Sequence, residues 1–223
     1  ESQRRFLAEA AHELRTPLAS MLGNVDLLVA FSDAPIRRQE TLAALQRTGR
    51  HVARLLDDLL LLAQAEAGWQ LTPLEPVALD DVLMEAYEAA QLIAVNVTLK
   101  VERCEPARVR GDLDRLRQVF SNLIDNAIKH SPPGGVVALN VWREEGQVKG
   151  SVKDCGTGIP REALPHIFVP FFRAPSAQRH PGVGLGLAIV HWTVRELGGK
   201  VAVESAIGQG TTVSFSLPED TSN

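Results

Sequence analysis

The chain has 223 residues, of which 45% are hydrophobic, so it is long enough for two modest domains with buried cores. Its formal net charge of −4 at pH 7 provides no basic surface, which argues against nucleic acid as the main partner. The two cysteines, Cys104 and Cys155, have no metal-ligand spacing and are too few for a disulfide scaffold, which favours a reducing compartment.

The chain shows no segment that would place it in a membrane. No apolar run approaches the roughly 20 residues that cross a bilayer, and no signal peptide is recognisable. The sequence starts at Glu1, already inside a helical pattern. We therefore interpret it as a fragment and expect any membrane contact only through a missing upstream segment.

Two stretches open the chain in which apolar residues recur at alternating intervals of three and four positions, and this pattern predicts a helical hairpin. The first seam consists of Leu7, Ala11, Leu14, Leu18, Met21, Val25 and Leu28. The second seam consists of Leu42, Leu45, Gly49, Val52, Leu56, Leu59 and Ala63. Turn residues at 32–35 separate the two seams, and Gly68 is a stop signal.

One hairpin cannot cover two broad apolar stripes by itself. Pairing with a second copy into a four-helix bundle would bury both stripes, so we predict a homodimer. The alternative is that the hairpin packs against the rest of its own chain.

A histidine lies beside the first seam. His12 follows the seam residue Ala11 by one position, so its side chain is expected to point outward, with Thr16 on the same face and Glu13 adjoining it. Neutral imidazole is a nucleophile at physiological pH, and a carboxylate on one nitrogen activates the other. Pro17 removes a helical hydrogen bond, so we expect a bend after the histidine. A lone exposed histidine is, however, usually just a solvated side chain.

From Val77 onward helical and strand patterns mix, which predicts an α/β sandwich with a mixed sheet. We expect helices at 80–95, 112–130 and 184–197, and strands at 97–101, 136–142, 148–152, 201–204 and 211–217. Asp80 is a possible helix cap. The predicted organisation is a hairpin domain at 1–68, a linker at 69–76, an α/β domain at 77–218 and a tail at 219–223.

Two asparagines lie four residues apart on the helix expected at 112–130. Asn122 and Asn126 therefore share one helical face. Asparagine is a poor helix former, and its amide oxygen is a reasonable ligand for a hard cation. Ligand binding explains the pair, although simple hydrogen-bonding anchors are the alternative.

Three further segments have the character of a nucleotide site. Asp154 follows a strand, where its carboxylate can accept a hydrogen bond from the exocyclic amine of adenine, and Gly156 and Gly158 let the backbone pass close to the base. By itself this D-x-G-x-G pattern could be only a turn. Residues 167–173, the phenylalanine segment, form an apolar patch that ends in Arg173.

The third segment contains the glycines Gly182, Gly184 and Gly186, which open a helix and can present backbone N–H groups to phosphate. A bare G-x-G-x-G does not identify a fold, and no Rossmann unit surrounds this one. Residues 174–181 are polar and contain proline, which predicts a mobile lid. A last glycine motif at 208–211 is expected to pack beneath it.

These motifs occur together and in order, and with them the chain resembles the sensor histidine kinases of two-component signalling over roughly Phe6 to Pro218. The HELRTP sequence at 12–17 matches the phosphoacceptor box of that family. The resemblance implies a dimeric four-helix bundle followed by the Bergerat ATP-binding fold of the GHKL superfamily. Cys155 departs from the Asn, Thr or Asp that is more usual at its position.

The resemblance also implies a role for each motif residue. In the hairpin it makes His12 the phosphoacceptor, Glu13 the general base, and Thr16 the residue that orients water for dephosphorylation of a regulator. In the second domain it makes Asn126 a direct ligand of Mg²⁺ and places Arg173 near the γ-phosphate of ATP. The other residues implied to bind the nucleotide are Asn122, Lys129, His130, Asp154, Gly156, Gly158, Gly182, Gly184, Leu185, Gly186 and Thr211.

The implied function is that of the cytoplasmic catalytic portion of an inner-membrane sensor. It would be an ATP-dependent protein-histidine kinase that phosphorylates His12, transfers the phosphoryl group to an aspartate of a response regulator receiver domain, and acts as a phosphatase on that regulator. Two alternatives stay open. One is a GHKL serine protein kinase of the anti-sigma type, which would need no such hairpin, and the other is an inactive dimeric signalling scaffold.

Overall fold

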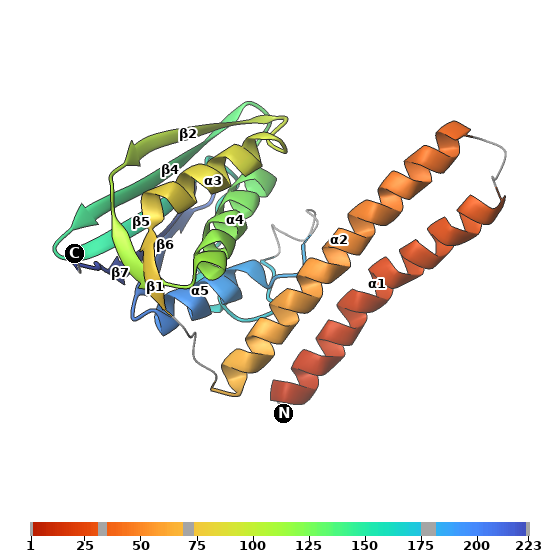
Figure 1. Ribbon diagram of the computed structural model, residues 1–223, viewed down its shortest axis with the longest axis horizontal. Coiled ribbons are helices and arrows are strands. Elements are labelled where there is room, and N and C mark those ends of the chain that lie inside the picture. The colour runs from red at the N-terminus through yellow and green to blue at the C-terminus, as the bar shows by residue number, and fades with distance from the viewer. Residues whose placement is uncertain (1, 31–34, 69–73, 175–181, 222–223) are drawn as a thin grey trace. The chain divides into compact units, whose positions relative to one another are not determined.

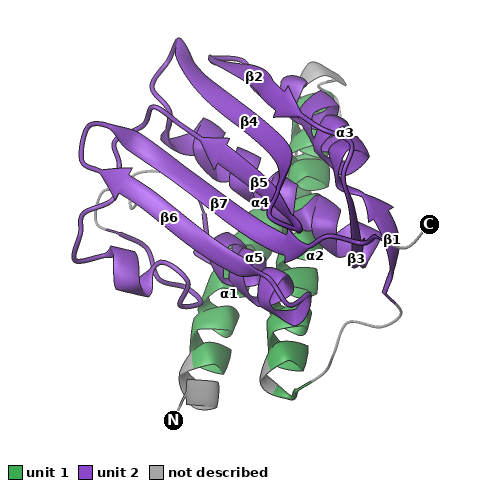
Figure 2. Cartoon of the chain, turned by 90° about the vertical axis from the view of Figure 1, so that its left-hand side faces the viewer, with its two compact units in different colours: residues 1–68 green, residues 69–223 purple. Residues whose placement is uncertain are grey.

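The computed structural model describes residues 2–30, 35–68, 74–174 and 182–221. By its internal contacts the chain divides into two compact units, residues 1–68 and residues 69–223 (Figure 2). Among the described residues, none of the helices has the length and apolar character of a membrane-spanning segment.

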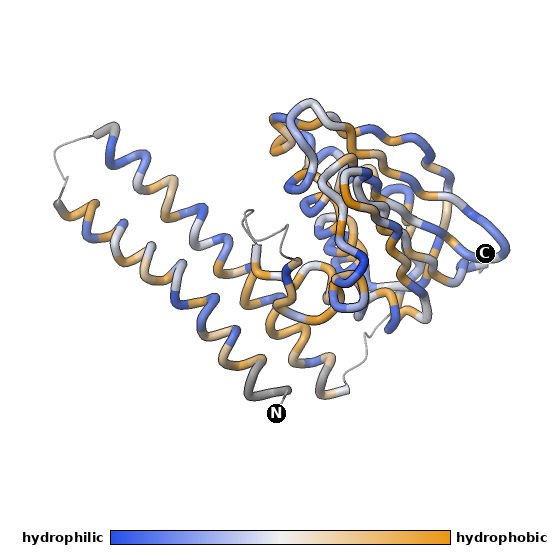
Figure 3. Tube along the Cα trace, turned by 180° about the vertical axis from the view of Figure 1, so that it is seen from behind, coloured by the Kyte–Doolittle hydropathy of each residue, from blue (hydrophilic) through white to orange (hydrophobic). Residues whose placement is uncertain are grey.

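The first unit is a pair of long helices, as the two seams predicted. Helix α1 spans Ser2–Ala30 and continues through Pro17, and helix α2 spans Pro35–Glu66 (Figure 1). Hydrophobic and hydrophilic stretches alternate along both helices (Figure 3). A Cβ atom at Gly49 would lie 3.9 Å from Met21 Cε, so the two seams meet there. Gly68, with a φ of 75°, follows the end of α2.

Each seam divides into a covered half and an uncovered half. Alternate positions are at least partly buried in the single chain: Leu14, Met21 and Leu28 on α1, and Leu45, Val52 and Leu59 on α2. The positions between them are exposed, apart from the partly buried Gly49: Ala11, Leu18 and Val25 on α1, and Leu42, Leu56 and Ala63 on α2. Leu7, at the start of the first seam, is exposed as well. Both helices therefore keep an uncovered apolar row along their length.

The second unit places three helices on one face of a five-stranded mixed sheet (Figures 1 and 2). The strand order is β2-β4-β5-β7-β6, in which β2 and β4 are parallel and every other pair is antiparallel. The helices are α3 (Leu79–Gln91), α4 (Leu113–His130) and α5 (Gly186–Glu196). The strands are β2 (Val97–Cys104), β4 (Gly135–Glu144), β5 (Gln147–Lys153), β6 (Lys200–Ala206) and β7 (Gly210–Pro218). The α/β sandwich expected from the sequence is confirmed.

This unit also contains a second, two-stranded sheet, which was not predicted. Strand β1 (Glu75–Ala78) pairs antiparallel with β3 (Arg108–Gly111). Strand β1 thus begins inside the range that we assigned to the linker, and Pro76 fits there because β1 pairs on one edge only. Glu219, which we assigned to a tail, forms a β-bridge with Val109 and an ion pair with Arg143.

Helix α4 shows how the local sequence fixes the core of the second unit. Asp112 caps the helix, because its Oδ1 atom accepts a hydrogen bond from Arg115 N at 3.1 Å. Apolar residues at helical spacing then bury one face: Leu116, Val119, Phe120, Leu123, Ile124 and Ala127. The ring of Phe120 meets that of Phe215 on β7 edge to face, with centroids 5.5 Å apart. Helix α4 is therefore fixed against the sheet, with its asparagines left off the buried face.

The prediction that Asp80 caps a helix was wrong. Helix α3 begins one residue earlier, at Leu79, and Ala78 occupies the cap position without a side-chain hydrogen bond. The Oδ1 atom of Asp80 instead accepts a hydrogen bond from Ala107 N at 3.1 Å, next to β3. The Asp80 side chain, which local sequence reasoning assigned to the helix end, thus bonds to a residue that is distant in sequence.

Candidate functional site

The predicted site residues fall into both units, which we describe in turn. In the hairpin, His12 and Thr16 are exposed on α1, and Glu13 between them is partly buried. The outward direction expected for His12 from its place beside the seam is therefore observed. An exposed imidazole next to a carboxylate is accessible to a reacting group from outside the hairpin.

In the second unit, the asparagine helix touches the start of α5. The Nδ2 atom of Asn122 donates a hydrogen bond to the carbonyl oxygen of Gly186 at 3.4 Å. A Cβ atom at Gly186 would lie 3.4 Å from Asn122 Cγ, so a side chain at 186 would crowd the amide. Asn126 lies one turn further along the same face and is partly buried, while Lys129 is exposed. The structure thus brings two of the predicted segments together, 64 residues apart in sequence.

Asp154 is nearly buried, with 9% of its surface exposed, and is held by two backbone groups. Its Oδ1 atom accepts hydrogen bonds from Gly156 N at 2.7 Å and from Thr211 N at 3.1 Å. Burial raises the pKa of the Asp154 carboxyl, and the two hydrogen bonds partly oppose this shift. Within the described residues both bonds end on Oδ1, which leaves Oδ2 as the oxygen that can accept from a ligand.

The loop after Asp154 fits its surroundings only because two positions lack side chains. Gly158 has a φ of 71°, and a Cβ atom there would lie 2.0 Å from the carbonyl oxygen of Ala206. At Gly156 a Cβ atom would lie 2.3 Å from the carbonyl oxygen of His130. The D-x-G-x-G loop is therefore pressed against both the end of α4 and the end of β6.

Sequence reasoning missed one residue that holds this loop. The hydroxyl of Ser205 accepts from Ile159 N at 2.8 Å and donates to the carbonyl oxygen of Gly210 at 2.9 Å. It also lies 2.8 Å from the Thr211 hydroxyl. Ser205 faces Thr211 directly across the β6–β7 pair, and this cross-strand register is the signal that could have identified it.

The phenylalanine segment contacts both the start and the middle of α5. Phe171 has a φ of 65°, and its N–H donates a hydrogen bond to the carbonyl oxygen of Gly184 at 3.0 Å. Gly184 has a φ of 82°, and a Cβ atom there would lie 2.7 Å from the carbonyl oxygen of Phe172. The ring of Phe168 stacks on that of His191. Sequence reasoning gave no role to His191.

Other residues of the predicted glycine-rich turn have simpler surroundings. Leu185 is 2% exposed and occupies the N-cap position of α5, so its side chain lies in the core. Helix α5 starts at Gly186, two residues later than predicted, because Gly184 is left-handed. Arg173 is partly buried, and Gly182 is exposed. Most of the predicted lid, residues 175–181, lies outside the described residues.

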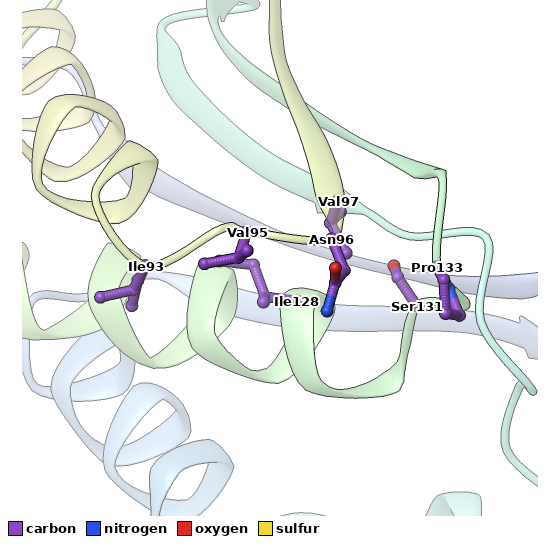
Figure 4. Close-up of a pocket in the computed structure, with 7 residues that line it drawn as sticks. All are labelled: Ile93, Val95, Asn96, Val97, Ile128, Ser131 and Pro133. Carbon is purple, nitrogen blue, oxygen red and sulfur yellow. The ribbon is translucent and has the colours of Figure 1, made fainter.

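A separate apolar pocket of about 360 Å³ lies beside the C-terminal turn of α4 (Figure 4). Its lining residues are Ile93, Val95, Asn96, Val97, Ile128, Ser131 and Pro133. None of them carries a charge, and none was predicted to bind nucleotide. The predicted nucleotide residues thus lie outside this pocket.

The comparison with protein families matches both units. Residues 2–68 match the family described as His Kinase A (phospho-acceptor) domain. Residues 111–221 match the family described as histidine kinase-, DNA gyrase B-, and HSP90-like ATPase. The two matches together cover both the exposed histidine and every predicted nucleotide residue.

Individual proteins give the same result. The sensor protein DivL of Caulobacter vibrioides is 38% identical over 221 residues, which are 97% of this chain but only 28% of DivL. Mycobacterial sensor histidine kinase MprB is 33% identical with a TM-score of 0.60, over 66% of this chain and 98% of the solved one. Full-length ShkA in complex with AMPPNP is 29% identical with a TM-score of 0.72, over 98% of this chain and 46% of ShkA.

Proposed function

The chain belongs to the sensor histidine kinases, with a phosphoacceptor hairpin followed by an ATP-binding unit, and on this premise we propose that it phosphorylates its own His12 from ATP. The phosphoryl group would then pass to an aspartate in the receiver domain of a response regulator. The single observation that carries the proposal is that one unit holds Asp154 and the contact of Asn122 with the start of α5, while the same chain carries the exposed His12.

The adenine end of the site is Asp154. Its Oδ1 atom is occupied by the backbone groups of Gly156 and Thr211, and its Oδ2 atom can accept a hydrogen bond from the exocyclic amine of adenine. The D-x-G-x-G loop is held by Gly158 and Ser205, so the carboxylate is positioned before the nucleotide arrives. This arrangement supports adenine over a base that presents an acceptor at the same place.

The phosphate end lies where α4 approaches the N-terminus of α5. Backbone N–H groups at the turn of Gly182, Gly184 and Gly186, together with the dipole of α5, favour a bound anion. Lys129 and His130 in the last turn of α4, and Arg173 in the phenylalanine segment, would add positive charge toward the triphosphate. Leu185 and Asn122 position this turn through packing and the Asn122–Gly186 hydrogen bond.

The residues present also fit a magnesium ion. Among the described residues no group of three His, Cys, Asp or Glu side chains could hold a metal by itself. Mg²⁺ in nucleotide sites commonly takes one or two protein ligands and completes its shell with phosphate oxygens and water. Asn126 is the amide that we assign to it, and the ion would neutralise charge on the β- and γ-phosphates.

The phosphoacceptor chemistry is assigned to α1. Glu13 would hold a proton of the His12 imidazole, so that the other nitrogen attacks the γ-phosphorus in line with the departing ADP. Thr16, on the same face as His12, would orient a water molecule in the reverse task of dephosphorylating the regulator. The phosphatase activity rests on this placement alone.

We further propose that the chain works as a homodimer, with the hairpins paired into a four-helix bundle. The uncovered halves of the two seams, for example Leu18 at 48% and Leu56 at 50% exposed, supply the apolar surface. ATP is a cytoplasmic nucleotide, so we place this unit on the cytoplasmic side of a sensor protein. The net charge of −4 argues against nucleic acid as the main partner.

The experiment that tests the proposed function uses γ-labelled ATP with Mg²⁺. The parent chain should acquire a label that is labile in acid and stable in base, as a phosphohistidine is, and His12→Gln should acquire none. The matched control is His51→Gln, because His51 is also an exposed histidine in the same hairpin and should be dispensable. Retained labelling in His12→Gln would exclude His12 as the nucleophile.

The stability of the label separates the alternatives. A serine kinase of the anti-sigma type would leave this chain unlabelled and place an acid-stable label on a separate protein. Full ATP binding with no label on any variant would favour the signalling scaffold. For the phosphatase proposal, Thr16→Ala should keep autophosphorylation within about twofold and slow regulator dephosphorylation at least about tenfold. Equal dephosphorylation rates would remove Thr16 from that role.

A further inference from the structure

Helix α5 carries an aromatic contact that the proposed mechanism does not use. His191 lies five residues after Gly186 and stacks on Phe168, with ring centroids 4.8 Å apart and ring planes 22° from parallel. At the rise of an α-helix the stack is about 8 Å along the axis from the turn assigned to the phosphates. It joins α5 to the phenylalanine segment, which ends in Arg173.

The same segment is joined to the start of α5 by a second contact. Phe171 donates its N–H to the carbonyl oxygen of Gly184, and to do so it adopts a φ of 65°. A bulky residue in this left-handed region is strained, and such a conformation persists only where the surroundings enforce it. Phe168, three residues earlier, joins the same segment to α5 through its stack on His191.

The identity of residue 191 matters for this contact. Burial and the nearby Arg195 lower the pKa of His191, so the neutral ring is favoured at neutral pH. A flat neutral ring can stack on Phe168 in the offset geometry that aromatic pairs prefer. A branched aliphatic side chain of similar size would fill the space without matching the flat face.

We propose that His191 is a positioning residue for the triphosphate of ATP. By stacking on Phe168 it holds the phenylalanine segment against α5, so that the Phe171–Gly184 hydrogen bond forms and Arg173 stays near the γ-phosphate. This inference rests on the proposed function, since it takes the phosphate turn and the role of Arg173 from it. His191 itself does not touch the nucleotide.

Loss of the Phe168–His191 stack should affect the binding of nucleotides that carry a γ-phosphate. Removing the stack should weaken ATP binding by roughly three- to tenfold, which is the range that one aromatic pair contributes. ADP lacks the phosphate that Arg173 faces, so its affinity should change by less than about twofold. A residue that only stabilised the fold would change both affinities together, or neither.

The test is calorimetric titration of the whole chain with Mg·ATP and with Mg·ADP. His191→Leu removes the ring and should lose ATP affinity selectively, whereas His191→Phe retains an aromatic face and should stay within about twofold of the parent. Phe168→Leu removes the other ring, and the double variant with His191→Leu should lose no more than either single change. Glu196→Gln, an exposed change on the same helix, is the matched control.

Each outcome decides the proposal. Equal losses for ATP and ADP, a His191→Phe variant as weak as His191→Leu, or additive losses in the double variant would overturn it. If His191→Leu does not fold, the Phe168→Leu variant carries the same comparison of ATP with ADP. Failure of the proposed function is distinguishable, because the parent chain itself would then bind no ATP or acquire no label on His12.

Discussion

In the helical hairpin, Leu18, Leu22 and Val25 are 48%, 69% and 46% exposed, whereas in the ATP-binding unit Leu79 and Leu116 are completely buried. Burial of one leucine side chain contributes about 1.5–3 kcal/mol, so the uncovered row of α1 forgoes a large stabilisation in a single copy. The ATP-binding unit gains that stabilisation from its own sheet and helices.

Because of this difference, the two units should depend differently on the concentration of the protein. A unit that closes its own core folds independently of other copies, whereas we expect the hairpin to bury its apolar rows by association with a second copy. The residues that we propose to bind the nucleotide all lie in the closed unit, where they are held by contacts such as Asn122–Gly186 and Asp154–Thr211. We therefore expect ATP binding to be independent of dimerisation and phosphoryl transfer to depend on the hairpin.

The largest predicted effect follows from separating the units. A fragment of residues 74–221 should keep the ATP affinity of the whole chain within about twofold, because the nucleotide contacts lie inside it. Its labelling of a separate 1–68 fragment at micromolar concentration should be slower by about 10²–10³-fold, since the tethered units have a millimolar effective concentration. Calorimetry and the labelling rate measure the two quantities. A fragment that folds but does not bind ATP would contradict the comparison.

The second prediction concerns the uncovered row of α1. Val25→Glu places a charge where we expect a second hairpin, and in a symmetric dimer that charge is buried twice. The dimer dissociation constant should rise about 100-fold or more, since each unpaired buried charge costs over 1 kcal/mol. Sedimentation measures the dissociation constant, with Ser20→Glu as the control because Ser20 is an exposed polar residue of the same helix. Equal dissociation constants would place the interface elsewhere.

The elements predicted correctly from the sequence are those specified by neighbouring residues. Helix α4 carries its own cap at Asp112 and an apolar face at helical spacing, and β4 and β5 are two apolar-rich stretches joined by a short turn. The tight loop at Asp154 follows from its glycines at fixed positions, and the Oδ1 atom of Asp154 bonds to Gly156 N inside it. In each case the determining signal lies within about 20 residues, the range that periodicity and turn chemistry cover.

What was missed depends on pairs that are distant in sequence. Strands β1 and β3 have four residues each and pair across a separation that no local period marks. Asp80 bonds to Ala107 and not to its own helix, and Ser205 gained its role only from its register opposite Thr211. The Phe168–His191 stack likewise requires the fold, because neither residue carries a local signal for the other.

The third prediction tests whether the Asp154 carboxylate, in the closed unit, accepts a hydrogen bond from adenine. Asp154→Asn keeps Oδ1 for Gly156 and Thr211 but turns an NH₂ donor toward the adenine amine. ATP affinity should fall about 10–100-fold, which corresponds to losing a hydrogen bond to a charged group. Calorimetry measures it, and Asp154→Ala, which also frees the two backbone donors, should bind no better and melt at a lower temperature.

The pH dependence of stability sharpens this prediction. Because burial raises the folded-state pKa of Asp154 above its ordinary 3.8, the ionised carboxylate costs stability, and that cost appears as the pH rises through the folded-state pKa. Asp154→Asn should therefore gain thermal stability over the parent at pH 7 and lose that advantage below about pH 4. A parent chain that gains on the variant as the pH rises would contradict the assigned shift.

The smallest predicted effect is at Cys155, the immediate neighbour of Asp154. Its thiol accepts a hydrogen bond from Val136 N, with the sulfur 3.3 Å from the nitrogen, and so faces the start of β4 and not the carboxylate. A serine hydroxyl can accept the same bond, so Cys155→Ser should leave ATP affinity within about twofold and the melting temperature nearly unchanged. Calorimetry under the conditions used for Asp154→Asn measures the contrast. A large loss would mean that this residue contacts the nucleotide, and the unusual cysteine would then have to be counted as part of the adenine site.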